Sequence, residues 1–211
     1  MPVRVHENEN DVVLLQREQY AKGGIGRWYW DLRDETVFRE VPVSTASILD
    51  AGCGEGITLE KMVRRFGGKT VTGVDILETN IAVCEQYSLP VKRADLQDTG
   101  FRENSFDCCT LIEVIEHIRN ADRVFGELHR ILAKKGVLIV VYPNDKVFKW
   151  ARTATLKFRE AAYNPGHVFQ WTPRRMEMAL IRNGYAVLKT TCIPFRFWPL
   201  CLHGVTVAVK K

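Results

Sequence analysis

Acidic residues close three successive apolar segments of the chain, and this order suits the binding of one small ligand. Asp50 ends the first segment, Asp75 the second and Asp95 the third. A carboxylate can accept hydrogen bonds from neighbouring hydroxyl groups or amines, and it can hold a cationic group. We therefore expect the three residues to bind a ligand that carries hydroxyl groups, amines and a positive charge.

A glycine-rich turn follows Asp50 in the stretch DAGCGEG, which contains Gly52 and Gly54. Glycine lets a ligand approach the backbone closely, and the amides at the start of a following helix would point towards that ligand. A dinucleotide-binding turn would need its third glycine at the position of Ile57. Since the chain lacks that glycine and has Glu55 as a second acid beside the turn, the turn suits a cationic ligand better than phosphates.

The spacing of the other acids favours an adenosine group. Asp75 follows Gly54 by about 20 residues, the separation at which an acid meets the hydroxyl groups of a ribose. Ile76 is placed to cover one face of an adenine. Asp95, with Leu96 after it, is placed to accept a hydrogen bond from the exocyclic amine of the base. The ligand expected from all three acids is adenosine joined to a positively charged amino acid.

The elements that must position these residues alternate between apolar strands and amphipathic helices. We expect strands at 47–51, 70–76, 90–95, 106–114, 137–143, 185–191 and 205–211, and helices at 11–20, 57–66, 79–87, 121–136 and 172–184. Continuous apolar strands that alternate with helices predict an α/β fold with a parallel sheet covered on both faces. Gly136 is expected to end the 121–136 helix in a left-handed conformation, with Lys134 and Lys135 at the negative end of that helix.

The ordered motifs DAGCGEG, GVD, ADL, SFDCCTLIEVIEHI and ELHRILAKKGVLIVVYPN resemble those of the class I S-adenosylmethionine-dependent methyltransferases. The resemblance covers residues 47–144 and continues more loosely through GHVFQWTPRRMEMALIRNGY. It implies a Rossmann-like, doubly wound sheet of seven mostly parallel strands with an antiparallel last strand. We expect one domain over residues 1–211, with a helical or lid segment at 1–43 and a possible cap insertion at 144–170.

The resemblance also implies S-adenosylmethionine as the cofactor, with small-molecule methyltransferases of the ubiquinone pathway as similar proteins. In that family the glycine turn contacts the methionine part through its backbone, and the acids hold the amino group, the ribose and the adenine. A backbone carbonyl at the end of the fourth strand lies near the amino group. The implied cofactor-binding residues of this chain are Asp50, Gly52, Gly54, Asp75, Ile76, Asp95, Leu96 and Glu113.

The segment EVIEHI is the strongest candidate for the chemistry of the acceptor. Methyl transfer from a sulfonium is an in-line displacement, so a base is needed only if the acceptor must lose a proton. His117 is the predicted base, although a histidine that caps the following helix or bonds locally fits the same position. The E-x-x-E-H spacing also resembles methyltransferases of the ubiquinone pathway and of the terminal ribose of small RNAs. In that reading Glu113, Glu116, His117 and His167 would bind a metal ion; similar methyltransferases without a metal carry the same EH pair.

Composition narrows the remaining choices. The 211 residues carry a net charge of +5 without a block of like charge, and the aromatic residues 28–30 lie in a charge-balanced segment. This argues against a nucleic-acid partner. Six cysteines without a C-x-x-C pair indicate free thiols in the cytoplasm, the N-terminal residues do not resemble a signal peptide, and no apolar run is long enough to span a bilayer.

We therefore predict a soluble methyltransferase that acts on a small, partly hydrophobic acceptor. The alternatives are a metal-assisted RNA ribose methyltransferase and a non-catalytic module that binds the adenosyl group. Ile57 argues against a nicotinamide oxidoreductase. Residues 192–204 are expected to form a hairpin loop packed at the edge of the sheet, with the wall of an acceptor pocket or a membrane contact as the alternative. His6, His129 and His203 are expected to be surface or packing residues.

Overall fold

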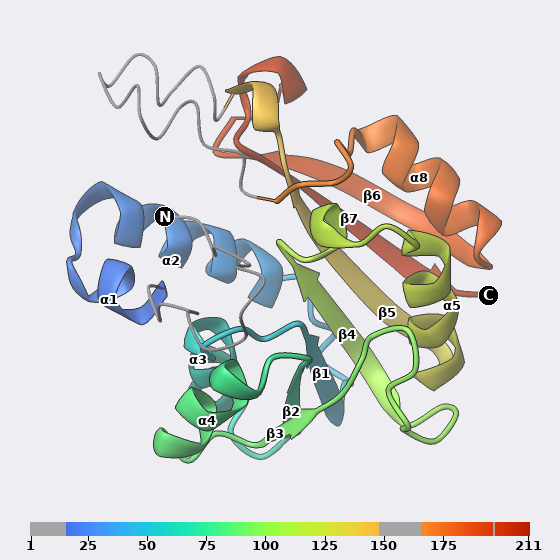
Figure 1. Cartoon of the computed structure of the whole chain (residues 1–211). Helices are drawn as coiled ribbons and strands as arrows, with labels where there is room; N and C mark the ends of the chain where they lie inside the picture. Colours follow the sequence, from blue (N-terminus) through green and yellow to red (C-terminus); the bar gives the residue numbers. More distant parts are fainter. Residues whose placement is uncertain (1–15, 148–165, 196) are drawn as a thin grey trace.

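The computed structural model describes residues 16–147, 166–195 and 197–211, which contain one seven-stranded sheet with helices on both faces (Figure 1). The strands are β1 (Ser47–Ala51), β2 (Thr70–Asp75), β3 (Val91–Arg93), β4 (Phe106–Ile112), β5 (Leu132–Pro143), β6 (Tyr185–Ile193) and β7 (His203–Lys210). The helices are α1 (Gln16–Ala21), α2 (Gly24–Phe38), α3 (Ile57–Arg65), α4 (Glu78–Gln86), α5 (Ala121–Ile131) and α8 (Pro173–Arg182), with short 3₁₀ turns η1 (Ile115–His117) and η2 (Trp198–Leu200).

The strand order is β3-β2-β1-β4-β5-β7-β6, and the first five strands are parallel. β7 runs antiparallel to both β5 and β6. This confirms the predicted Rossmann-like α/β sheet with an antiparallel last strand. Because β7 runs the opposite way, its first residue, His203, pairs with Pro143 at the end of β5. His203 therefore lies at the edge of the sheet where the parallel strands end.

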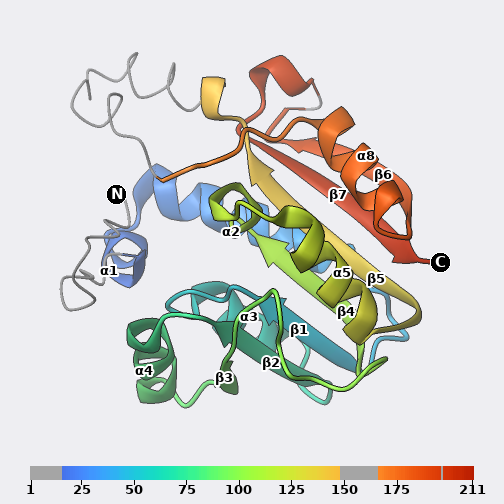
Figure 2. The same ribbon diagram turned by 45° about the vertical axis from the view of Figure 1, so that its right-hand side comes forward.

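Two apolar clusters hold the helices against the sheet. One contains Leu128 of α5 and Met176 of α8, and these two helices lie on the same face (Figure 2). The other contains Val37 of α2 and Leu59 of α3. All six cysteines are free and five of them are buried, as the sequence predicted. No helix in the described part of the chain is long and apolar enough to cross a membrane.

The structure differs from the expected helices in two places. Residues 24–38 form helix α2, which was not among the expected helices and has glycines at 24 and 26 in its first turn. α5 ends at Ile131 rather than at Gly136, because Leu132 is already extended and pairs with Phe106 of β4. The left-handed residue is Lys135, with φ 61°. The helix predicted at 11–20 is seen as α1 from residue 16, and residues 11–15 lie outside the described part.

Candidate functional site

The glycine-rich turn connects β1 to α3 at the carboxyl end of the sheet. The amides of Gly52 and Cys53 both donate to the carbonyl of Val74, at 2.8 and 2.9 Å, which ties the turn to β2. Gly52 has φ 77°. A Cβ atom there would approach Cγ2 of Val114 to 2.4 Å. Only glycine therefore fits this position, for reasons of both backbone conformation and space.

Asp75 holds the second half of the turn. Its Oδ2 accepts from the amide of Gly54 at 2.9 Å, and its Oδ1 accepts from the amide of Leu77 at 2.9 Å and from Nδ2 of Asn80 at 3.1 Å. These bonds use three of the roughly four acceptor positions of a carboxylate. The neighbouring Ile76 is 55% exposed and offers an apolar surface beside the turn.

Asp50 is buried at the end of β1 and is only partly satisfied. Its Oδ1 accepts from Oγ1 of Thr110 at 2.8 Å, while Oδ2 has no hydrogen-bond partner among the described residues. Burial raises the pKa of Asp50 to about 7, against the lowering effect of the bond from Thr110. A cationic group beside Oδ2 would supply the missing donor and favour the ionised carboxylate. The site therefore fits the ammonium group of a bound amino acid.

Asp95 and Leu96 follow β3, and the structure separates their side chains. Asp95 is exposed, and its Oδ1 accepts from the amide of Gln97 at 2.8 Å. The side chain of Leu96 is only 7% exposed and belongs to the apolar core. A ligand at this edge can therefore meet the carboxylate of Asp95, whereas Leu96 offers only its backbone.

Glu55 does not face the ligand side of the turn, contrary to the expectation that two acids flank a cationic ligand. Its carboxylate accepts from the backbone amides of Gln16 at 3.0 Å and Arg17 at 2.7 Å, the first residues of α1. The first amides of a helix lack partners within the helix, and a carboxylate satisfies them well. Glu55 thus fixes α1 over the glycine turn, and Asp50 is left as the acid that can meet a cation.

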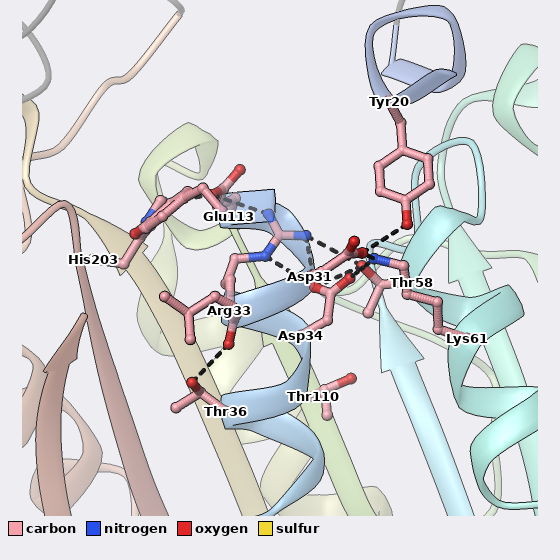
Figure 3. A network of polar contacts seen from close by, with 12 residues as sticks. Tyr20, Asp31, Arg33, Asp34, Thr36, Thr58, Lys61, Thr110, Glu113 and His203 are labelled. Atoms are coloured by element: carbon pink, nitrogen blue, oxygen red, sulfur yellow. Dashed lines mark hydrogen bonds and ion pairs between the residues drawn. The ribbon is translucent and has the colours of Figure 1, made fainter. Parts of the chain in front are cut away.

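Helix α2 brings a buried arginine to the end of the sheet (Figure 3). Arg33 contacts Asp34 at 2.8 Å, Glu113 at 3.1 Å and Oγ1 of Thr58 at 3.2 Å. Lys61 of α3 contacts the other oxygen of Asp34 at 2.6 Å. The network links α2 to the helix that follows the glycine turn and to the end of β4. The sequence analysis missed it, because the only signal was a charged pair on the apolar side of a helix.

Glu113 follows β4 and lies in the left-handed region, with φ 55°. Its carboxylate forms an ion pair with Arg33 and also contacts Nε2 of His203. Burial alone would raise the pKa of Glu113, but Arg33 and then His203 outweigh burial and hold the pKa well below its usual range. The side chain of Glu113 is therefore an ionised acceptor committed to these two residues.

Three of the four candidate metal ligands lie together. One ligand atom from each of Glu116, His117 and His167 lies within 4.8 Å of the others. Oε2 of the buried Glu116 has no hydrogen-bond partner among the described residues, and burial raises the pKa of this carboxyl well above its usual range. A cation would satisfy that oxygen, so the three residues fit a metal ion with mixed carboxylate and imidazole ligands. Glu113 does not join them.

The imidazoles of His117 and His167 pack edge to face with ring centres 4.8 Å apart. Burial and then the nearby His167 lower the pKa of His117. Nδ1 of His167 lies 2.7 Å from the carboxylate of Asp145. His117, the predicted base, is exposed. Because its pKa is lowered, it favours the neutral form, which can accept a proton.

Several known proteins are similar to this chain in sequence. A family model described as a methyltransferase domain matches residues 49–140. A ubiquinone biosynthesis O-methyltransferase of Bartonella bacilliformis is 24% identical over 147 residues, which are 67% of this chain and 55% of that protein. A probable S-adenosylmethionine-dependent methyltransferase of Mycobacterium tuberculosis is 30% identical over 161 residues, which are 74% of this chain and 56% of that protein. The chain thus spans about half the length of these curated relatives.

Solved structures show the same fold at low sequence identity. A methyltransferase of Archaeoglobus fulgidus superposes with a TM-score of 0.68 at 15% identity, covering 92% of this chain and 98% of that one. The [4+2]-cyclase SpnF also reaches 0.68 at 15% identity, covering 85% of this chain and 80% of that one. The family model and the curated relatives support a class I S-adenosylmethionine-dependent methyltransferase, and the solved structures show the shared fold. The cofactor of this family is S-adenosylmethionine.

Proposed function

We propose that this protein binds S-adenosylmethionine at the carboxyl edge of its sheet and transfers the methyl group to a small, partly hydrophobic acceptor. The observation that carries the proposal is the pair of buried carboxylates on either side of the glycine turn. Asp75 holds the amide of Gly54, and Asp50 keeps one buried oxygen without a partner among the described residues. When bound, the cofactor supplies a methyl group on a positively charged sulfur.

Each residue of the donor site has a separate proposed role. Asp50 accepts the ammonium group, and Asp75 offers its remaining acceptor position to a ribose hydroxyl. The exposed side chain of Ile76 covers one face of the adenine. The other proposed contacts of the donor are the backbone of Gly52, Gly54 and Leu96, the carboxylate of Asp95, and the backbone carbonyl of Glu113.

We propose a partly apolar acceptor because the loop between β6 and β7 presents apolar side chains. Phe195, Phe197 and Leu200 are exposed, at 59%, 64% and 60%. The carbonyl of Trp198 accepts from Nδ2 of Asn144 at 2.8 Å, which places this hairpin loop next to the end of β5. The relatives named for ubiquinone biosynthesis support an acceptor of this kind.

The segments on either side of this edge are proposed to enclose the acceptor. Helices α1 and α2 would form the lid, since α1 is already fixed to the glycine turn through Glu55. The cap expected at 144–170 stays a prediction, because its residues 148–165 lie outside the described part of the chain. The role of the chain in an in-line displacement is then to hold the acceptor against the methyl group and to exclude water.

The proton of a hydroxyl acceptor also needs a destination, and His117 is the base proposed from the sequence. A second candidate function is favoured by the cluster of Glu116, His117 and His167, in which a divalent metal ion would polarise the acceptor oxygen. In that case His117 would be a ligand and not a base. An RNA ribose would be one acceptor of such an enzyme, and a non-catalytic adenosyl-binding protein remains the alternative without turnover.

The proposal is tested by calorimetry followed by a turnover screen. S-adenosylhomocysteine should bind with a 1:1 stoichiometry while NAD should not compete. Metabolite extracts incubated with donor labelled in the methyl group should then yield a labelled small molecule. Binding without any labelled product would support the non-catalytic alternative, and no binding would contradict the donor site itself. Loss of product after treatment with EDTA, restored by Mg²⁺ or Mn²⁺, would support the metal-assisted form.

A further inference from the structure

A second histidine lies at the reactive edge of the sheet, away from the candidate metal cluster. His203 is the first residue of β7 and pairs with Pro143, so it lies beside the end of β5. It is only 1% exposed. Its Nε2 contacts the carboxylate of Glu113, which follows the neighbouring β4 (Figure 3). This imidazole is therefore buried next to the residue that follows β4.

The other nitrogen of His203 contacts a tyrosine of helix α2. Nδ1 lies 2.6 Å from Oη of Tyr29, and the two rings stack with centres 5.6 Å apart. Tyr29 is partly exposed. Tyr29, His203 and Glu113 thus form a continuous series of polar contacts that runs from the tyrosine hydroxyl through the buried imidazole to a half-buried carboxylate.

The charge on Glu113 fixes the direction of these bonds. An ionised carboxylate can only accept, so Nε2 of the neutral imidazole must carry the proton that it donates to Glu113. In the neutral tautomer that carries its proton on Nε2, Nδ1 is the acceptor and the hydroxyl of Tyr29 is its donor. Arg33 contacts the same carboxylate oxygen, Oε1, at 3.1 Å, and its positive charge favours the ionised form of Glu113.

We propose that Tyr29, His203 and Glu113 form a proton relay that serves a hydroxyl acceptor, an inference that rests on the proposed methyl transfer. As the acceptor oxygen forms its bond to the methyl carbon, the carbon–sulfur bond breaks and its electron pair stays on sulfur. The acceptor proton passes to Oη of Tyr29 while the tyrosine proton passes to Nδ1 of His203. The imidazolium that results is held by the negative charge of Glu113. The products are a methyl ether, S-adenosylhomocysteine and one proton on the enzyme.

The relay supplies a base for the acceptor proton, which the metal-assisted mechanism otherwise lacks. If His117 binds a metal ion, it cannot accept the acceptor proton, and the relay provides another base. Tyr29 cannot act alone, because burial and then the charge of Glu113 raise its pKa far above its usual range, so it transfers a proton only by passing one on. The charged and titratable groups around the relay are Arg33 and Tyr29 from α2, Glu113 after β4, and Cys201 from the loop before β7.

The direction of the bonds can be tested without an acceptor. Long-range ¹H–¹⁵N correlation spectra of the full chain with ¹⁵N-labelled histidine, at pH 8 and with S-adenosylhomocysteine bound, report which ring nitrogen carries the proton. His203→Gln assigns the signals, and His129→Gln, which removes a histidine on α5, is the matched control. We expect the proton on Nε2 and a shift of the Nδ1 signal in Tyr29→Phe. A proton on Nδ1, or an Nδ1 signal that Tyr29→Phe leaves in place, would overturn the relay.

Turnover of 3,4-dihydroxybenzoate tests the role in catalysis. Tyr29→Phe and His203→Gln should each lower kcat by about 100-fold or more, with donor affinity by calorimetry close to that of the wild type. Because both substitutions interrupt the same relay, the double variant Tyr29→Phe/His203→Gln should be about as slow as His203→Gln alone. Additive losses in the double variant, or a donor-bound enzyme that methylates amines but not this phenol, would contradict the relay. Failure to bind S-adenosylhomocysteine would instead refute the proposed function.

Discussion

Substitution of Asp50 by asparagine separates the folding role of this residue from its binding role. The side chain is 2% exposed and its pKa is about 7, raised chiefly by burial from 3.8. A carboxyl group whose pKa is raised on folding favours the folded state at low pH, and that contribution is lost as the pH rises from about 4 to 7. At pH 8 the folded protein therefore holds a buried negative charge at a cost.

The magnitude follows from the size of the shift. Three pKa units correspond to about 4 kcal/mol as an upper bound, at about 1.4 kcal/mol for each unit. Asp50→Asn should thus raise the free energy of unfolding at pH 8 by roughly 1–4 kcal/mol. The donor ammonium favours the ionised carboxylate, so wild-type affinity should rise about tenfold from pH 6 to pH 8 as Asp50 loses its proton. Loss of the charge-assisted bond should weaken binding at pH 8 by about 1.5–3 kcal/mol, or roughly 10- to 150-fold.

Two assays test these figures together. Urea unfolding at pH 8 gives the stability difference, and calorimetry with S-adenosylhomocysteine at pH 6, 7 and 8 gives the affinity and its slope. Asp107→Asn is the matched control: this acid accepts from the amides of Ala46 and Ser47 at 2.8 and 3.0 Å, at the opposite end of the sheet, so donor binding should keep its slope. If Asp50→Asn binds as tightly as the wild type, or is less stable at pH 8, the assignment of the buried oxygen to the donor is wrong.

Two further substitutions test the donor site, and a third tests an ion pair that stabilises the fold. Asp75→Ala should lower donor affinity at least 10-fold and remove the partner of the Gly54 amide, at about 1–3 kcal/mol in urea unfolding; calorimetry that gives near-normal affinity would refute its ribose role. Gly52→Ala should abolish donor binding, because the new methyl group would lie 2.4 Å from Val114; normal binding would show that the turn tolerates the displacement. Glu127 lies on α5, and the hydrogen bond from Arg130 is the chief cause that lowers its pKa to about 2. The stabilising effect of its ionised form is therefore present above pH 4.5 and is lost towards pH 2. Glu127→Gln should cost roughly 1–3 kcal/mol at pH 7, a difference that closes in acid; an equal loss at pH 2.5 would contradict the ionic origin.

Local patterns predicted the sheet well because they depend on neighbouring residues. The alternation of apolar strands with helices predicted the elements, and acids at the ends of three strands indicated the edge at which we propose that the donor binds. The end of α5 was mispredicted because Leu132 pairs with Phe106, a residue that is distant in the sequence. The segment after Ile131 thus forms a strand in place of the expected helix, because of a pairing with β4 that no local pattern reveals.

The side of the site that faces the acceptor could not be predicted in the same way. Arg33 and His203 meet Glu113 only because α2 crosses the end of β4 and β7 runs antiparallel. The E-x-x-E-H spacing suggested a shared role for Glu113 and Glu116, yet Glu113 contacts Arg33 and His203, whereas Glu116 lies with His117 and His167. Ion pairs between distant segments decide which acids act together, and spacing along the chain does not contain that information.

The central claim is that the carboxylates of Asp50 and Asp75 hold an adenosyl amino acid beside the glycine turn. A crystal structure of the protein grown with S-adenosylhomocysteine tests it most directly. The account predicts the ammonium group against Oδ2 of Asp50, the ribose hydroxyls against Asp75 and the adenine over Ile76. A ligand bound elsewhere, or a diphosphate-containing nucleotide bound in the turn, would contradict it.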